Sequence, residues 1–105
     1  MIKDKVAIIT GASSGIGYAT AIALSTAGAK VAIGARRTDK LEQLENQIKN
    51  NGGKVLSQRL DVTKKTDCDT FVEQTIKKWG AVDILVNNAG LMPLSFVKNL
   101  KVDEW

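Results

Sequence analysis

The sequence predicts an α/β fold in which helices cover both faces of a parallel sheet. Short apolar segments alternate along the 105 residues with longer segments whose apolar side chains recur at helical spacing. This alternation is typical of strand–helix–strand units with parallel strands. Most of the apolar segments are nearly continuous, as expected for strands that are buried on both faces of a sheet.

Four strands and three helices are expected in strict alternation. The strands are expected at residues 5–10, 31–35, 55–60 and 82–86, and the helices at residues 15–27, 38–51 and 64–79. Right-handed crossovers then predict a doubly wound sheet with the strand order 3-2-1-4. This order places the third strand, which contains Ser57, Gln58 and Arg59, at an edge of the sheet, where polar side chains are tolerated.

Apolar residues at helical spacing indicate how the helices pack. The first helix is rich in alanine and is expected to end before Gly28. The second helix has Leu41, Leu44 and Ile48 on one face, and Asp39 stands near its start with the spacing of a capping box. The third helix has a longer apolar row, which consists of Cys68, Phe71, Val72, Ile76 and Trp79.

A glycine-rich turn, TGASSGIG at residues 10–17, joins the first strand to the first helix. In such a turn Gly11 supplies the backbone angles of a tight bend, Gly15 leaves the backbone open to a pyrophosphate, and Gly17 allows close packing of helix and strand. The free amides and the dipole at the helix N-terminus favour a bound phosphate. The turn is therefore a candidate phosphate site.

The spacing of these glycines narrows the class of nucleotide. It is G-x-x-x-G-x-G rather than the G-x-G-x-x-G fingerprint, and no Lys-Ser or Lys-Thr pair follows, so a nucleoside triphosphatase is disfavoured. Taken alone, three glycines also fit an ordinary glycine-rich turn, and that alternative stays open at this point.

Composition argues against several other classes of protein. With 44% hydrophobic and 25% charged residues the chain has the balance of a globular domain, so disorder is not expected. No apolar run reaches the roughly 18 residues of a membrane span, and a cytoplasmic protein is expected. The single cysteine, Cys68, and the lack of histidine disfavour a disulfide or a zinc site. The net charge of +4 comes from fifteen basic residues spread along the chain, so nucleic-acid binding is also disfavoured.

The end of the second expected strand indicates which dinucleotide would bind. An acidic residue at this point would bind the adenosine ribose hydroxyls, but the chain has Ala35, followed by Arg36 and Arg37. A guanidinium offers a planar set of donors to a 2'-phosphate, whereas a carboxylate would repel it. The sequence therefore favours NADP(H) over NAD(H). The alternative is that the two arginines form a solvated loop pair.

These motifs together resemble the short-chain dehydrogenase/reductase family. TGASSGIG is similar to that family's TGxxxGxG turn, Asp61-Val62 to its adenine-contacting pair, and NNAG at residues 87–90 to a second family motif. The resemblance covers nearly the whole chain and implies a Rossmann-like fold, an NAD(P)(H) cofactor and a small carbonyl or alcohol substrate. It also implies that Ser13, Ser14 and Ile16 line the phosphates, that Asp61 and Val62 meet the adenine, and that Asn88, Ala89 and Gly90 lie along the ribose.

The family's catalytic Ser, Tyr-x-x-x-Lys pair and helical Asn have no counterpart in these 105 residues. The only tyrosine, Tyr18, has Ile22 four positions on, so Tyr18 is interpreted as a packing residue and no catalytic residue is assigned. The leading hypothesis is that residues 1–105 are the N-terminal part of a single dinucleotide-binding Rossmann domain, without its catalytic half. The full protein is then expected to be an NADP(H)-dependent oxidoreductase and a homo-oligomer, and the 105-residue chain alone to be inactive. The alternative is a self-standing NADP-binding or sensing module.

Overall fold

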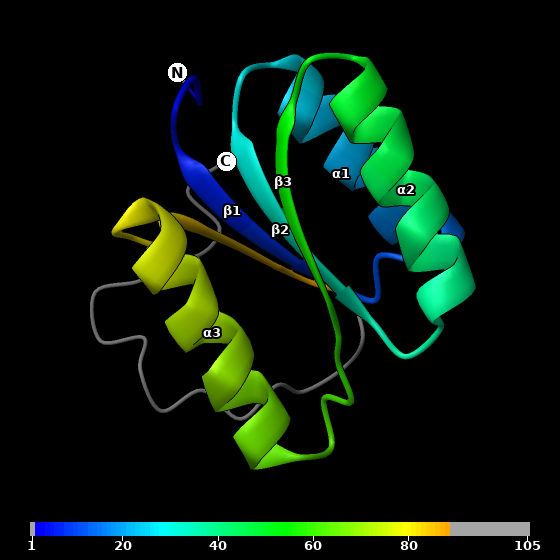
Figure 1. Cartoon of the computed structure of the whole chain (residues 1–105), viewed down its shortest axis with the longest axis vertical. Helices are drawn as coiled ribbons and strands as arrows, with labels where there is room; N and C mark the ends of the chain where they lie inside the picture. Colours follow the sequence, from blue (N-terminus) through cyan, green and yellow to red (C-terminus); the bar gives the residue numbers. More distant parts are fainter. Residues whose placement is uncertain (1, 89–105) are drawn as a thin grey trace.

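A parallel sheet with helices on both faces makes up the computed structural model, which describes residues 2–88 (Figure 1). Within these residues the elements are β1 (Val6–Thr10), α1 (Gly15–Thr26), β2 (Lys30–Ala35), α2 (Thr38–Asn50), β3 (Lys54–Arg59), α3 (Lys65–Trp79) and β4 (Ile84–Asn87). Each expected element is present, and its ends lie within two residues of the predicted ones. The fold is a Rossmann-like α/β fold, as predicted.

The sheet has the strand order β3-β2-β1-β4, and all of its neighbouring strands are parallel. This confirms the predicted order 3-2-1-4 and places the more polar β3 at an edge. The chain winds outwards from β1 to β3 and then crosses to β4 on the other side of β1. At this reversal Thr10, the last residue of β1, lies between Gly34 of β2 and Asn87 of β4. Ligands of open α/β sheets bind at such a switch point.

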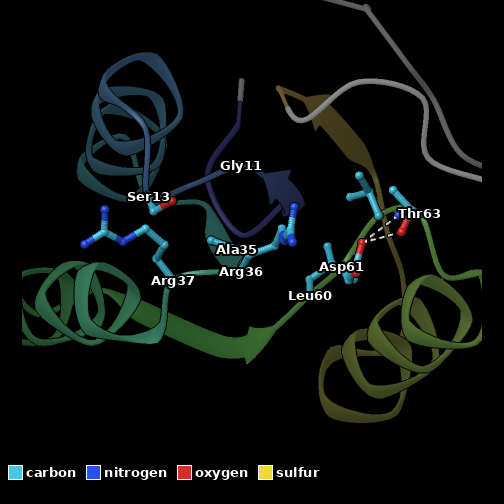
Figure 2. Close-up of a pocket in the computed structure, with 9 residues that line it drawn as sticks. Gly11, Ser13, Ala35, Arg36, Arg37, Leu60, Asp61 and Thr63 are labelled. Atoms are coloured by element: carbon cyan, nitrogen blue, oxygen red, sulfur yellow. Dashed lines mark hydrogen bonds between the residues drawn. The ribbon is translucent and has the colours of Figure 1, made fainter.

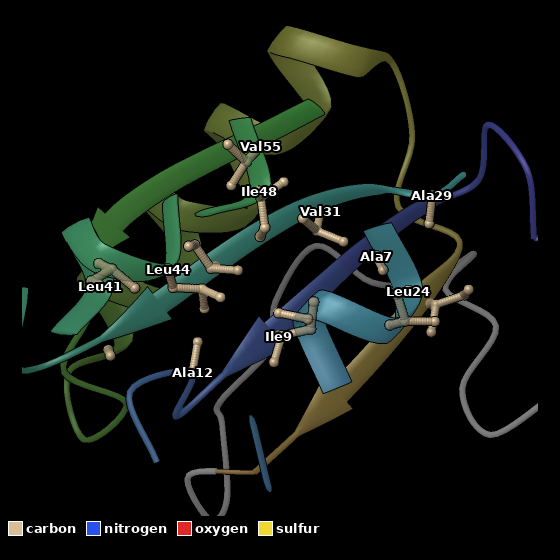
Figure 3. Packing of buried hydrophobic residues seen from close by; sticks show 14 residues of the cluster. Ala7, Ile9, Ala12, Leu24, Ala29, Val31, Leu41, Leu44, Ile48 and Val55 are labelled. Atoms are coloured by element: carbon tan, nitrogen blue, oxygen red, sulfur yellow. The ribbon is translucent and has the colours of Figure 1, made fainter. Parts of the chain in front are cut away.

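Helices α1 and α2 cover one face of the sheet (Figures 1 and 3). Their apolar sides, with Leu24 from α1 and Leu44 and Ile48 from α2, pack against Ile9 and Val31 of the central strands. The leucine and isoleucine side chains of α2 are essentially buried, as its helical spacing predicts. Each such side chain contributes about 1.5–3 kcal/mol of hydrophobic stabilisation, so this layer holds α1 and α2 firmly beside the sheet.

Helix α3 covers the opposite face, where Phe71, Val72 and Cys68 are buried. Burial raises the pKa of the Cys68 thiol, which is consistent with the predicted packing role. Ile76 was expected in the same buried row, but this prediction is wrong because its side chain is 38% exposed. Thr75 is buried instead, and its hydroxyl donates to the carbonyl of Phe71 at 2.8 Å, so a polar side chain is satisfied within the helix.

The starts and ends of the helices show which local signals the fold uses. Helix α1 ends at Thr26, with Ala27 as its C-cap, and is followed by Gly28, whose φ of +101° suits glycine. Helix α2 has Arg37 at its N-cap and no side-chain cap, so the capping box expected from Asp39 is wrong. Asp39 lies in the first turn instead, where a carboxylate still favours the helix dipole. None of the helices within residues 2–88 is long and apolar enough for a membrane span.

Candidate dinucleotide-binding site

The glycine-rich turn forms a tight bend between β1 and α1. Gly11 has a φ of +64°, in the left-handed region that glycine tolerates. Its carbonyl accepts two hydrogen bonds from Ser14, one from the backbone N–H at 3.1 Å and one from the hydroxyl at 2.9 Å. The N–H of Ala12 donates to the carbonyl of Gly34 at 3.2 Å. These bonds fix the turn against the end of β2.

Gly15 and Gly17 differ in the space around them. A Cβ atom on Gly17 would overlap the carbonyl oxygen of Gly11 and would lie 3.0 Å from the Asn88 side-chain nitrogen. A Cβ atom on Gly15 would have no neighbour within 4 Å. The close packing predicted for Gly17 is therefore confirmed. The backbone at Gly15 is open, which is the local geometry that a pyrophosphate requires, although contact with a phosphate stays a prediction.

Thr10 and Asn88 connect the turn to the end of β4. The Thr10 hydroxyl donates to Asn87 Oδ1 at 3.0 Å and accepts the backbone N–H of Asn88 at 3.1 Å. The Asn88 side-chain nitrogen then donates to Ser14 Oγ at 2.7 Å and, at 3.4 Å, to the Gly11 carbonyl. The hydroxyl of Ser14 is thus held by two protein groups. The Ser14 side chain therefore stabilises the turn, whereas Ser13 of the same turn lines the neighbouring cavities.

A cavity of about 350 Å³ opens beside the turn, at the carboxyl ends of β1, β2 and β3 (Figure 2). Its walls come from three segments that are far apart in the sequence. The lining residues are Gly11, Ser13, Ala35, Arg36, Arg37, Leu60, Asp61, Val62 and Thr63. The structure therefore brings together the glycine-rich turn, the two arginines and the Asp61-Val62 pair, which the sequence analysis had singled out separately.

The two arginines point to different parts of this region. In Figure 2, the Arg37 side chain extends towards Ser13, whereas the Arg36 guanidinium lies between Gly11 and Asp61. Arg37 forms an exposed ion pair with Asp39, with 3.3 Å between Nη2 and Oδ2. An exposed pair of this kind is worth roughly 0–1 kcal/mol, so an anionic ligand could replace the carboxylate at small cost. Arg36 forms no ion pair within the described residues 2–88.

Asp61 lies at the far wall of the cavity and is held in a local turn. Its Oδ1 accepts the Thr63 hydroxyl at 2.6 Å and the Thr63 backbone N–H at 3.0 Å. The pKa of the Asp61 carboxyl is held below its usual value, mainly by the Thr63 hydroxyl. The Thr63 backbone N–H and the nearby charge of Arg36 lower it further. The backbone N–H of Asp61 donates to Asp67 at the start of α3, so α3 also positions this wall.

Replacing Thr63 with Val is expected to raise the pKa of Asp61 towards the ordinary value of 3.8, because the largest stabilising contact of the carboxylate is lost. Since folding lowers this pKa, the ionised carboxylate favours the folded state above the pH where the unfolded chain titrates. That contribution is lost as the pH falls through the folded-state pKa. A carbon-detected NMR titration of Asp61 measures the shift. Thr63→Ser, which keeps the hydroxyl, should titrate like the wild type, and an unchanged midpoint in Thr63→Val would contradict the assignment.

The remaining predicted residues differ in how they meet the cavity. Val62 lines it and also packs against the α3 side of the core. Ile16, on the first turn of α1, has a side chain that is 74% exposed. Ala89 and Gly90 lie outside the described residues. Tyr18 packs against the α1–α2 core layer and donates its hydroxyl to Gln47 at 2.9 Å, in agreement with a packing role.

Sequence reasoning missed Thr10, Thr63 and Leu60. Thr63 carried a usable signal, because Asp followed two residues later by Thr is a common turn pattern. Thr10 begins the glycine-rich turn, but its bonds to the end of β4 carried no signal, since its partners are 77 and 78 residues away. Among residues 2–88 there is no cluster of three or more His, Cys, Asp or Glu side chains that could hold a metal ion.

A glycine-rich turn at the switch point of a parallel sheet, with a cavity beside it, defines a dinucleotide-binding α/β protein. The family model for short chain dehydrogenase matches residues 5–105. The chain therefore belongs to the short-chain dehydrogenase/reductase family.

Individual relatives agree with this assignment. An uncharacterized oxidoreductase of Listeria monocytogenes is 51% identical over 104 residues, and the match covers 99% of this chain and 42% of the relative. A 7α-hydroxysteroid dehydrogenase solved with NADH is 40% identical with a TM-score of 0.82, covering 86% of this chain and 35% of that one. A metagenomic short-chain oxidoreductase solved with NADP is 38% identical with a TM-score of 0.80, covering 86% and 41%. Both dinucleotides therefore occur among similar structures.

Proposed function

We propose that this chain binds NADP(H) for a short-chain oxidoreductase that transfers hydride between the cofactor and a small carbonyl or alcohol. The observation that carries the proposal is the cavity that joins the glycine-rich turn to Arg36 and Arg37. At the end of β2, where a carboxylate would select NAD(H), the chain has buried Ala35 and then two exposed guanidinium groups. These groups supply the positive charge that a 2'-phosphate needs.

The residues in and beside the first cavity fit successive parts of the dinucleotide. The open backbone at Gly15 and the N-terminus of α1 would hold the pyrophosphate. Arg36 would hold the 2'-phosphate, and Asp61 and Val62 would meet the adenine. The nicotinamide, when bound, supplies the hydride. The contribution of this chain is to bind and orient the dinucleotide.

The acid–base groups of the reaction are proposed to lie outside these 105 residues. Tyr18, the only tyrosine, is engaged by Gln47 and has no lysine four positions on. The chain spans 42% of the length of the Listeria relative. The activity, the substrate, the homo-oligomeric state and the cytoplasmic location of a whole protein thus stay proposals.

A self-standing NADP-binding or sensing module is the second candidate. The described residues form the glycine-rich turn, the cavity and both core layers, and the sequence has no Tyr-x-x-x-Lys pair. This candidate shares the dinucleotide site and differs only in the absence of turnover, so the binding experiment below applies to both.

Arg36→Asp is expected to weaken NADPH binding about tenfold or more, which corresponds to about 1.4 kcal/mol. The substitution removes a donor to the 2'-phosphate and adds a carboxylate that repels it, while NADH, which lacks this phosphate, should bind within about threefold of wild type. Fluorescence titration of the intact protein with each dinucleotide measures both values.

The control is Lys54→Asp, which makes the same change in charge on exposed Lys54, at the amino end of β3 and outside the cavity. It should leave the ratio of NADPH to NADH affinity unchanged. An Arg36→Asp protein that keeps the wild-type ratio would refute the proposed role of Arg36, and wild-type protein that prefers NADH would refute the NADP(H) function itself.

A further inference from the structure

A second cavity adjoins the glycine-rich turn on the side of α2. It has a volume of about 340 Å³ and is lined by Ser13, Ser14, Gly15, Tyr18, Ala19, Lys40 and Gln43. Ser13 also lines the first cavity, so the two cavities meet at this residue. The second cavity therefore continues the dinucleotide site into the space between α1 and the first turns of α2.

The charges around this second cavity single out Lys40. Arg37, three positions earlier, forms an exposed ion pair with Asp39 that an anionic ligand would have to displace. Lys40 forms no ion pair within the part of the chain that the structure describes. It lines the cavity together with Ser13 and Gly15 of the proposed phosphate turn. An ammonium group on a flexible stem is well suited to a phosphate as a point charge.

We propose that Lys40 is a specificity residue that contacts the 2'-phosphate of NADP(H) from the α2 side, opposite Arg36. This inference rests on the proposed NADP(H) function and adds a residue to it. Arg36 approaches from the cavity next to Asp61, and Lys40 approaches from the cavity between α1 and α2, so the phosphate beside Ser13 would meet a cation on each side. Among the ion pairs of residues 2–88 there is none with Lys40, so Lys40, unlike Arg37, gives up no such partner when it contacts a phosphate.

The test compares Lys40→Gln with Lys40→Arg in the intact protein. Adenosine 2',5'-bisphosphate and adenosine 5'-monophosphate serve as probes, because they differ only in the 2'-phosphate. Lys40→Gln should weaken binding of the bisphosphate about threefold to fivefold, in the range expected for one exposed ion pair. It should change the affinity for the monophosphate less than about twofold. Lys40→Arg should restore the bisphosphate affinity. The salt dependence of bisphosphate binding should become shallower in Lys40→Gln, since one charge contact is lost.

Lys77→Gln is the control, because Lys77 is an exposed lysine in the last turn of α3 and lines neither cavity. It should leave the affinity for both probes unchanged. If Lys40→Gln binds the bisphosphate like wild type while Arg36→Asp does not, the assignment of Lys40 is wrong and the NADP(H) function stands. If the wild-type protein does not distinguish the two probes, the NADP(H) function fails, and the role of Lys40 fails with it.

Discussion

Gly17→Ala is expected to destabilise the folded protein by about 2–3 kcal/mol, in the upper part of the range for overpacking a tight site. The added methyl would overlap the Gly11 carbonyl oxygen and press on the Asn88 side chain, and backbone is the part that cannot move aside cheaply. Relief requires α1 to shift away from β1, which would also move the N–H groups that face the phosphates. Urea denaturation followed by circular dichroism measures the loss of stability, and NADPH titration measures the accompanying loss of affinity.

Gly15→Ala is the matched control, because it adds the same methyl two residues away in open space. Its stability should equal or exceed that of the wild type, since alanine is the better helix former. Its NADPH affinity should nevertheless fall, because the methyl would stand where the pyrophosphate approaches the backbone. Comparing Gly17→Ala with Gly15→Ala therefore separates the effect on packing from the effect on dinucleotide binding. Equal stability losses in both variants, or none in Gly17→Ala, would contradict this account of the turn.

Thr10→Val is expected to cost about 1–3 kcal/mol, because it removes two part-buried hydrogen bonds worth about 0.5–1.5 kcal/mol each. The substitution keeps the shape of a fully buried side chain but removes the hydroxyl that accepts the Asn88 N–H and donates to Asn87. The turn then loses its link to β4, so dinucleotide affinity should fall as well. Thermal or urea unfolding measures the first effect and NADPH titration the second.

Thr75→Val provides the comparison for this prediction, since Thr75 is equally buried and its hydroxyl donates within α3 to the Phe71 carbonyl. Removing that hydroxyl should cost less and leave dinucleotide affinity unchanged. Thr10→Ser, which retains the hydroxyl, should bind like the wild type. A Thr10→Val protein with wild-type NADPH affinity would show that the link to β4 does not position the turn.

The sequence allowed the strands, their order and the glycine-rich turn to be predicted, because each depends on local periodicity or on a spacing within a few residues. The assignment of Ile76 to the core failed because Thr75 and Ile76 are neighbours on the helix, and only packing against the sheet decides which one turns inwards. The capping box at Asp39 failed because the N-cap of α2 is Arg37, two residues before Asp39. The Ile76 error shows that tertiary packing can override a local pattern.

Within the site, the arginines could be found from the sequence because they follow directly after a strand, and Asp61 because the Asp61-Val62 pair resembles a family motif. Lys40 could not, since its relevance depends on α2 lying beside α1 and leaving a cavity between them. The same holds for the hydrogen bond from the Asn88 side chain to the Ser14 hydroxyl, which joins residues 74 positions apart. Residues that act through long-range contacts carry no spacing signal.

The bond between Thr10 and Asn87 joins segments 77 residues apart, and this has a consequence for the order of folding. Closing so long a loop is entropically more costly than pairing β1 with β2, and contacts of large sequence separation slow folding. The bonds that hold the glycine-rich turn against β4 therefore form only when β4 docks beside β1. We expect a nascent chain to acquire this part of the site only after Asn88 has been synthesised.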